Sequence, residues 1–261
     1  MLQHMKSACK SFLLRFGYEI RAVRQPIVDN VDFKAALTVK ESEYYSRWVG
    51  PCPLFSPWLG HPEFQAVYEG AKPYTVVSPD RCYILISLAR YASHLAGDFA
   101  ECGVYRGGTA LLLARILGNE VNKRLYLFDS FQGLPKMDQE KDPWFSEGQY
   151  CAESVEAVEE LLSDFRSIID IRCGWIPETF RGLENNRYAF AHLDVDLYQS
   201  TLDCFYPRLM PGGMLLFDEY AFAPSRGEKD AVDEFFADKP ESPITLPTGQ
   251  AMVLKVPSNG Q

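Results

Sequence analysis

Residues 99–110, FAECGVYRGGTA, decide the fold of this chain. An apolar, strand-like run ends at Gly103, and a pair of glycines at 107–108 then opens a stretch with helical spacing. Three further apolar runs end in acidic residues, with helical segments between them: RLYLFDS (124–130), YAFAHLDVD (188–196) and MLLFDEY (214–220). Apolar strands that alternate with helices predict a parallel sheet covered on both faces. We therefore expect an α/β protein with a doubly wound, Rossmann-like sheet.

The rest of the sequence adds an extension at one end of the chain and a hairpin at the other. Residues 25–75 are rich in proline and aromatic residues and lack a regular period, which is typical of short helices and turns. Regular helical spacing begins at Ser78 and Pro79, a common helix start. The run ITLPTGQAMVLKV (244–256) predicts a hairpin that adds an antiparallel edge. We expect a helical N-terminal extension that caps the core over residues 1–77, and one catalytic-size domain over residues 78–261.

Composition narrows the class of protein. The formal net charge of −9 and the pI of about 5.0 argue against a nucleic-acid binder, which needs a basic face. No apolar run approaches the roughly 18 to 20 residues that span a bilayer, and no signal-peptide pattern is present. Seven cysteines without a C-x-x-C pair fit neither a disulfide framework nor a zinc ribbon, and we expect Cys102, Cys173 and Cys204 to be reduced core residues. These features predict a soluble, cytoplasmic protein.

Residues 1–24 differ in charge from the rest of the chain, because they carry five basic residues and one acidic residue, with apolar residues between them. Two interpretations stay open: an amphipathic helix that touches a membrane or a second subunit, and a surface helix docked on its own chain. On the first interpretation we expect a homodimer.

Acidic residues end three of the predicted strands: Asp129 the first, Asp194 and Asp196 the second, and Asp218 and Glu219 the third. In an open α/β sheet, ligands bind beyond the carboxyl ends of the parallel strands. We therefore expect a binding site at this edge of the sheet.

The glycine turn indicates the kind of ligand. A dinucleotide fingerprint reads G-x-G-x-x-G, but Tyr105 replaces the second glycine, the one that admits a pyrophosphate. The carboxylate of Asp129 can accept two ribose hydroxyls, so turn and acid together predict a nucleoside cofactor without a pyrophosphate. The structural alternative for Asp129 is a turn cap. A nicotinamide-dependent oxidoreductase is the alternative function; Tyr105 and the lack of a suitable Y-x-x-x-K pair argue against it.

Four ordered motifs carry a resemblance to a known family: FAECGVYRGGTA, LYLFDSFQGLP (125–135), GWIPETF (174–180) and HLDVDLYQSTLDCFYPRLMPGGMLLFDEY (192–220). Together they resemble the macrocin-type O-methyltransferases, which methylate sugar and phenolic hydroxyls of bacterial natural products. The resemblance runs from about Pro79 to Phe236. It implies a class I methyltransferase fold, a substrate cap within residues 1–75 and S-adenosylmethionine as the cofactor. It also implies a small-molecule acceptor, either a sugar or a phenol.

The same resemblance implies roles for individual residues at the cofactor. Glu101, Gly103 and Gly107 would line its methionine and ribose side, with Asp129 at the ribose hydroxyls and Ser130 beside them. Gly174 and Trp175 fall where the adenine would lie. For Trp175 a core or lid aromatic is the alternative interpretation. The polar loop Gln132–Tyr150 is a candidate lid, and an ordinary insertion is the alternative interpretation.

The acids of the later strands indicate a metal. Carboxylates at neighbouring strand ends repel unless a positive charge lies between them, and Mg²⁺ prefers oxygen ligands. The resemblance implies the same ion, with Asp194, Asp218 and Glu219 as ligands. The family usually has aspartate or asparagine where this chain has Glu219, whose side chain is one methylene longer. Alternatively the acids cap helices and pair with Arg208 or Arg226.

The expected chemistry is metal-assisted O-methyl transfer. The cofactor's methyl group is already activated, so the protein has to align the acceptor oxygen and assist loss of its proton. Asp194 or Asp196 would take that proton. His192 is either a second candidate base or, as is more common for a histidine inside an apolar strand, a satisfied buried residue. A non-catalytic cofactor-binding partner is a further alternative function.

Overall fold

The computed structural model describes residues 56–59, 61–118, 122–134, 147–151, 154–195, 198–222 and 226–257. These residues belong to one compact unit, Pro53–Gln261. The N-terminal segment on which the homodimer was predicted lies outside the described residues, as does most of the predicted cap. The domain boundary at residue 77 therefore stays a prediction.

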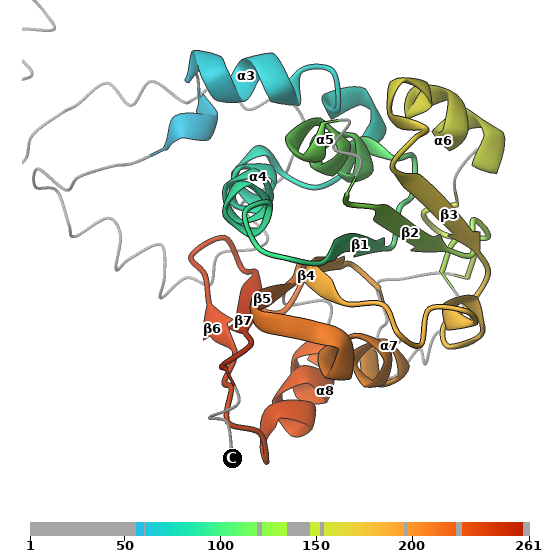
Figure 1. Ribbon diagram of the computed structural model, residues 1–261. Coiled ribbons are helices and arrows are strands. Elements are labelled where there is room, and N and C mark those ends of the chain that lie inside the picture. The colour runs from blue at the N-terminus through green and yellow to red at the C-terminus, as the bar shows by residue number, and fades with distance from the viewer. Residues whose placement is uncertain are drawn as a thin grey trace, which may run out of the picture. The chain divides into compact units, whose positions relative to one another are not determined.

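The seven strands of the described residues form one sheet in the order β3-β2-β1-β4-β5-β7-β6 (Figure 1). The first five in this order are parallel, whereas β7 pairs antiparallel with both β5 and β6. This confirms the doubly wound, Rossmann-like α/β fold and the antiparallel edge hairpin. The strands are β1 Asp98–Cys102, β2 Leu125–Asp129, β3 Ile169–Cys173, β4 Tyr188–Leu193, β5 Leu209–Phe217, β6 Ile244–Thr245 and β7 Ala251–Leu254.

Helices cover both faces of the sheet (Figure 1). One face carries α4 Pro79–Ala92, α5 Gly108–Leu117 and α6 Val155–Leu161, with α3 Pro62–Tyr68 packed on α4 and α5. The other face carries α7 Tyr198–Phe205 and α8 Arg226–Phe236. Short 3₁₀ turns complete the described chain: η1 Pro57–Leu59, η2 Lys72–Tyr74, η3 Ser163–Phe165, η4 Glu178–Phe180 and η5 Tyr206–Arg208.

Side chains alternate between the two cores along the strands. In β2, Leu125 and Leu127 pack under α4 and α5, whereas Tyr126 and Phe128 pack on the α7 and α8 side. This alternation follows from the two-residue period of a strand. It decides which polar side chains can meet under the same helices.

The PGG segment at 211–213 is part of β5. The register between β4 and β5 shifts between Tyr188 and Phe190. A Cβ on Gly213 would lie 2.8 Å from the Met210 carbonyl oxygen and 3.0 Å from that of Tyr188. Glycine is needed there because the backbones approach too closely for any side chain.

Two details of the described chain bear on earlier expectations. Cys102 is buried, as predicted. Cys173 is exposed, because it lies at the open end of β3, and so it is not the core residue that its apolar neighbours suggested.

Among the described residues, no helix is both long enough and apolar enough to cross a membrane.

Candidate functional site

The glycine turn after β1 brings two strand ends together. Gly103 has a φ of 83°, and a Cβ at this position would overlap the carbonyl oxygen of Asp194. Gly107, with a φ of 85°, is the residue before the first turn of α5. The structure thus explains why residue 103 is a glycine, because the end of β4 passes directly against it. The sequence did not reveal this contact.

Asp129 is held by backbone N–H groups at the end of β2. Its Oδ2 accepts hydrogen bonds from the amides of Val104 at 2.7 Å and Tyr105 at 2.9 Å, and its Oδ1 accepts one from Phe131 at 2.7 Å. Tyr105 and Phe131 both have positive φ values, 51° and 56°. An ionised carboxylate offers about four acceptor positions. Asp129 can therefore fix both turns and still accept a ribose hydroxyl.

An open cavity of about 470 Å³ lies next to this carboxylate's turn. It has the size of a small-molecule site. Trp175 is one of its walls and keeps 38% of its surface exposed, and the other walls come from Gln132–Leu134, Glu147 and Gly148. Ser130 is buried and accepts a hydrogen bond from the Gln132 amide at 3.1 Å. The Gly174 amide donates to the Asp129 carbonyl at 2.9 Å, so the predicted adenine-side residues lie beside the predicted ribose-side residue.

A row of buried polar groups crosses the sheet face under α4 and α5. Glu101 and His192 are register partners on β1 and β4, and Asp218 follows Phe217 at the end of β5. His192 Nδ1 lies 2.9 Å from Glu101 Oε1, and its Nε2 lies 3.5 Å from Asp218 Oδ1. Burial raises the pKa of Glu101, against hydrogen bonds from His192 and Thr109 that favour its ionised form. Its Oε2 atom is buried and has no hydrogen-bond partner of normal geometry among the described residues.

The row carries charge in spite of its burial. Burial alone lowers the pKa of His192, but hydrogen bonds to Asp218 and Glu101 outweigh it and raise this pKa to about 10. Burial alone would raise the pKa of Asp218, but the charge of Arg81 and the hydrogen bond to His192 hold it below its usual value. His192 is fully buried with both ring nitrogens engaged. It therefore fits the satisfied buried residue rather than a base that reaches an acceptor.

Two residues at Asp218 were missed by the sequence reasoning. The guanidinium of Arg81, in the first turn of α4, forms an ion pair with Asp218 Oδ2. The side-chain amide of Gln250 donates to Oδ1 at 2.8 Å. Arg81 was detectable as an arginine in a first helical turn, where the helix dipole disfavours a cation. Gln250 was not, because its place follows from the antiparallel pairing of Phe217 with Ala251.

The three predicted metal ligands lie at adjacent strand ends. Asp194 and Asp218 each follow one residue of the register pair Leu193 and Phe217, and Glu219 comes next. Burial and the charges of Asp218 and Glu219 raise the pKa of Asp194 well above its ordinary value, against the opposing charges of His192 and Arg81. These carboxylates therefore act on one another strongly. Among the described residues, no group of three His, Cys, Asp or Glu side chains is arranged to hold a metal ion.

Three further residues were predicted at this edge or as partners of its acids: Asp196, Arg208 and Arg226. Asp196 lies outside the described residues, as does the side chain of Arg226. Arg208 donates to the carbonyl oxygens of Cys204 at 2.6 Å and Glu184 at 3.3 Å. Among the described residues, the cations that act on Asp194 and Asp218 are Arg81 and His192. The Arg208 guanidinium binds backbone carbonyls instead.

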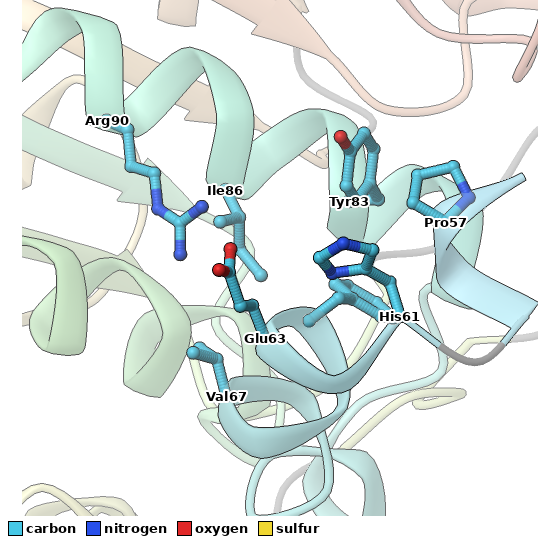
Figure 2. A pocket seen from close by; sticks show the side chains of 8 residues that line it. Pro57, His61, Glu63, Val67, Tyr83, Ile86 and Arg90 are labelled. Carbon is cyan, nitrogen blue, oxygen red and sulfur yellow. The ribbon is translucent and has the colours of Figure 1, made fainter. Parts of the chain in front are cut away.

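A second, smaller cavity of about 100 Å³ lies between α3 and α4 (Figure 2). The side chains of Glu63 and Arg90 point into the same space. None of the predicted site residues lines it. Among the predicted site residues that the structure describes, Trp175 lines the larger cavity and none lines the smaller one.

Comparison with known proteins decides the family. A sequence model described as Macrocin-O-methyltransferase (TylF) matches residues 75–247, more than half of the chain. The chain belongs to the macrocin O-methyltransferase family. The family match covers the glycine turn, Asp129, the Trp175 segment and all the acids at the strand ends.

Curated members of the macrocin O-methyltransferase family are similar to this chain over part of their length. It is 34% identical over 161 residues to demethyldecarbamoylnovobiocin O-methyltransferase of Streptomyces niveus, covering 56% of this chain and 60% of that protein. It is 30% identical over 158 residues to 8-demethyl-8-(2,3-dimethoxy-alpha-L-rhamnosyl)-tetracenomycin-C 4'-O-methyltransferase of Streptomyces olivaceus, covering 55% and 59%. The matches span about three fifths of each relative.

Solved structures agree with the family's fold. The O-methyltransferase NovP is similar with a TM-score of 0.62 and 25% identity, over 74% of this chain and 88% of that one. Calicheamicin methyltransferase CalS11 is similar with a TM-score of 0.59 over 88% and 99%; its 18% identity shows the fold alone.

Proposed function

We propose that this macrocin-family protein transfers a methyl group from S-adenosylmethionine to a hydroxyl oxygen of a sugar or phenol in a natural-product-like small molecule. The observation that carries the proposal is Asp129, which the amides of the glycine turn hold at the end of β2. An open cavity walled by residues 132–134 and Trp175 follows it along the chain. The motifs of this edge lie within the family match. The names of the curated relatives, both O-methyltransferases of complex small molecules, support the same class of acceptor.

The residues at the carboxyl edge fit this cofactor. Asp129 would bind the ribose hydroxyls, with Gly103, Gly107 and Ser130 shaping the turn, and Gly174 and Trp175 would contact the adenine. Glu101 offers its Oε2 as an unsatisfied buried acceptor for the cationic amino group of the methionine part. The bound cofactor supplies an electrophilic methyl group. Positioning the acceptor oxygen in line with that group can contribute on the order of 7 to 11 kcal/mol.

The finer part of the proposal is assistance by Mg²⁺. Asp194, Asp218 and Glu219 are oxygen donors of the kind that Mg²⁺ prefers, and they act on one another electrostatically. The chemistry that such an ion supplies is charge stabilisation at the acceptor oxygen. Asp218 can bind such an ion only if one of its carboxylate oxygens contacts the ion while Arg81 and Gln250 stay bound to the same carboxylate.

Asp194 and Asp196 are the proposed proton acceptors. Asp194 lies at the end of β4 against Gly103, so it joins the cofactor turn to the acid edge. Asp196 stands two residues further along. A carboxylate within reach of the acceptor hydroxyl would take its proton as the methyl group transfers.

A second candidate function is a cofactor-binding protein without catalysis. The observation that favours it is Asp218, whose two oxygens are already paired with Arg81 and Gln250. Loss of turnover in Asp194→Asn with retained cofactor binding would support catalysis, whereas unchanged behaviour of this variant would support the binding protein.

The test is methyl transfer from isotopically labelled S-adenosylmethionine to a panel of sugar and phenol acceptors, followed by mass spectrometry with Mg²⁺ or with EDTA. We expect label on a hydroxyl oxygen, with a higher rate in Mg²⁺. Calorimetry with S-adenosylhomocysteine measures cofactor binding separately. Absence of both binding and transfer would reject the proposal, and equal rates in EDTA would reject only its metal part.

Two further properties are part of the proposal. We propose a homodimer and a cytoplasmic location, supported by the basic N-terminal segment and by composition respectively. Light scattering of the full chain tests the first, and fractionation of the source cells tests the second.

A further inference from the structure

The described part of the chain holds three residues other than glycine in the left-handed backbone region, and all three lie near the glycine turn. They are Tyr105, Phe131 and Tyr150, with φ values of 51°, 56° and 59°. This conformation costs free energy for a residue with a Cβ, and residues strained in this way cluster at functional sites. In Tyr105 and Phe131 it directs the amides toward Asp129. The turns at Asp129 do not include Tyr150, so the conformation there has a different reason.

Hydrogen bonds fix the backbone on both sides of this tyrosine. Before it, the Leu134 amide donates to the Gln149 carbonyl at 2.8 Å, and the Gly148 amide donates to the Leu134 carbonyl at 2.9 Å. After it, the Cys151 thiol donates to the Phe131 carbonyl at 3.3 Å. The segment after β2 therefore holds the strained conformation in place and fixes the direction of the tyrosine side chain.

The Tyr150 side chain reaches both the glycine turn and the acids. Its ring meets that of Tyr105 edge to face, with the centroids 6.1 Å apart and the planes at 88°. Burial raises the pKa of the Tyr150 hydroxyl, and the charges of Glu219 and Asp194 raise it further. The hydroxyl is therefore protonated at neutral pH, within the field of the acids, and can donate a hydrogen bond.

The Tyr150 ring lies apart from the cavity proposed for the adenine. Glu147 and Gly148, earlier in the same segment, line that cavity together with Trp175, whereas Tyr150 does not. Tyr150 keeps 42% of its surface exposed. An exposed aromatic ring beside carboxylates suits a ligand that has an apolar ring face next to a hydroxyl group. Sugars and phenols share this chemistry.

We propose that Tyr150, supported by Tyr105, binds the methyl acceptor by stacking on its ring and so directs an acceptor hydroxyl toward the acids at the ends of β4 and β5. The inference rests on the proposed methyl transfer, and it assigns the contact that selects the acceptor. The strained backbone at residue 150 is kept because it turns the ring toward the acids and away from the adenine cavity.

The test is binding of two probes to the chain loaded with S-adenosylhomocysteine, measured by saturation-transfer NMR titration. The probes are methyl α-L-rhamnopyranoside, a sugar, and catechol, a phenol. We expect Tyr150→Gly to bind the preferred probe about tenfold more weakly, because the stacking ring is gone. Tyr150→Phe keeps the ring and should stay within about threefold. Tyr91→Ala, which removes a 59% exposed tyrosine of α4, is the matched control and should not change the affinity.

Stability gives a second readout that a purely structural tyrosine would move in the opposite direction. Glycine adopts a φ of 59° without strain, so the urea midpoint of Tyr150→Gly should not fall, although probe affinity does. A lower midpoint with unchanged probe affinity would show that Tyr150 only supports the fold. A loss of affinity in Tyr150→Phe as large as that in Tyr150→Gly would overturn the stacking contact.

A measurement on the unchanged chain covers the case in which Tyr150→Gly does not fold. Tetranitromethane nitrates accessible tyrosines, and mass spectrometry locates the modified residues. We expect the preferred probe to protect Tyr150 and not Tyr91 in the chain loaded with S-adenosylhomocysteine. Equal nitration of Tyr150 with and without the probe would overturn the inference.

The outcomes separate this inference from the proposed function. Equal probe affinity in the unchanged chain and Tyr150→Gly, or binding of neither probe while S-adenosylhomocysteine binds, overturns the role of Tyr150 alone. If the unchanged chain neither binds S-adenosylhomocysteine nor methylates any acceptor of the panel, the proposed function fails and the role of Tyr150 fails with it.

Discussion

The carboxyl edge of the sheet has two halves that hold their acids by different means. At β1 and β2, backbone amides of the glycine turn fix Asp129, which stays partly open to solvent. At β4 and β5, side chains from distant elements fix Asp218, which is buried. The first half is built from residues close to the turn, whereas the second depends on the whole domain being folded.

Because the two halves hold their acids differently, we expect substitutions in one half to affect ligand binding and substitutions in the other to affect stability. Removing a charge from the open half should weaken ligand binding and leave the fold intact. Removing a charge from the buried half leaves cations without a partner, so it should affect the fold first.

The largest expected effect is that of Asp218→Asn. The substitution keeps an acceptor for Gln250 but leaves Arg81 and His192 without their shared counter-charge. We expect the free energy of unfolding at neutral pH to fall by about 3 kcal/mol, the size measured when one partner of a buried ion pair is removed. Urea unfolding in EDTA measures it. A loss below about 1 kcal/mol would show that the buried half is not held by charge.

An intermediate effect is expected for Asp129→Asn. The amide keeps one acceptor for the turn but loses the negative charge, so affinity for S-adenosylmethionine should fall on the order of 10- to 100-fold. Calorimetry measures the affinity, and urea unfolding should show a smaller loss than for Asp218→Asn. Asp170→Asn, on the neighbouring strand β3 and paired with Arg172, is the matched control and should bind normally. Unchanged affinity in Asp129→Asn would show that Asp129 acts as a turn cap and not as a ligand of the cofactor.

The smallest effect concerns Glu241, a buried acid outside the edge. Burial would raise its pKa, but hydrogen bonds from the Tyr206 hydroxyl at 2.7 Å and the Val256 amide at 3.1 Å, with Lys255 nearby, hold it below the ordinary value. Its ionised form therefore stabilises the fold above the unfolded pKa of about 4.3, and this contribution disappears as the pH falls through the lower folded value.

Glu241→Gln should accordingly cost about 1 to 2 kcal/mol at neutral pH, and the cost should narrow below about pH 4. Urea unfolding from acid to neutral pH measures the difference between the two proteins. A difference that stays constant with pH would contradict the assigned charge. Cofactor binding should be unaffected, which separates this acid from those of the edge.

The sequence predicted what depends on neighbours along the chain. The strand, turn and helix at 99–110, the start of α4 after Ser78 and the closing hairpin all follow from local residue types and spacing. Their positions at strand ends were enough to predict that Asp194 and Asp218 lie close together, because parallel strands end at the same edge of a sheet.

Long-range pairing could not be predicted in this way. Arg81 meets Asp218 across 137 residues, and its place in the first turn of α4 does not reveal which acid it pairs with. The row from Glu101 through His192 depends on the register of β1 and β4, which a single sequence does not reveal. Asp129 was predicted as a ribose ligand and as a turn cap, and its three amide contacts are compatible with both.

The contact between Gly103 and the Asp194 carbonyl joins the two halves into one inherited unit. No side chain fits between them, so neither half can be exchanged for a differently shaped one without rebuilding the other. A recombinant protein that takes β1 and its turn from one ancestor and β4 from another would have to match at this single point of contact. Engineering of this edge therefore has to change both strand ends together at this contact.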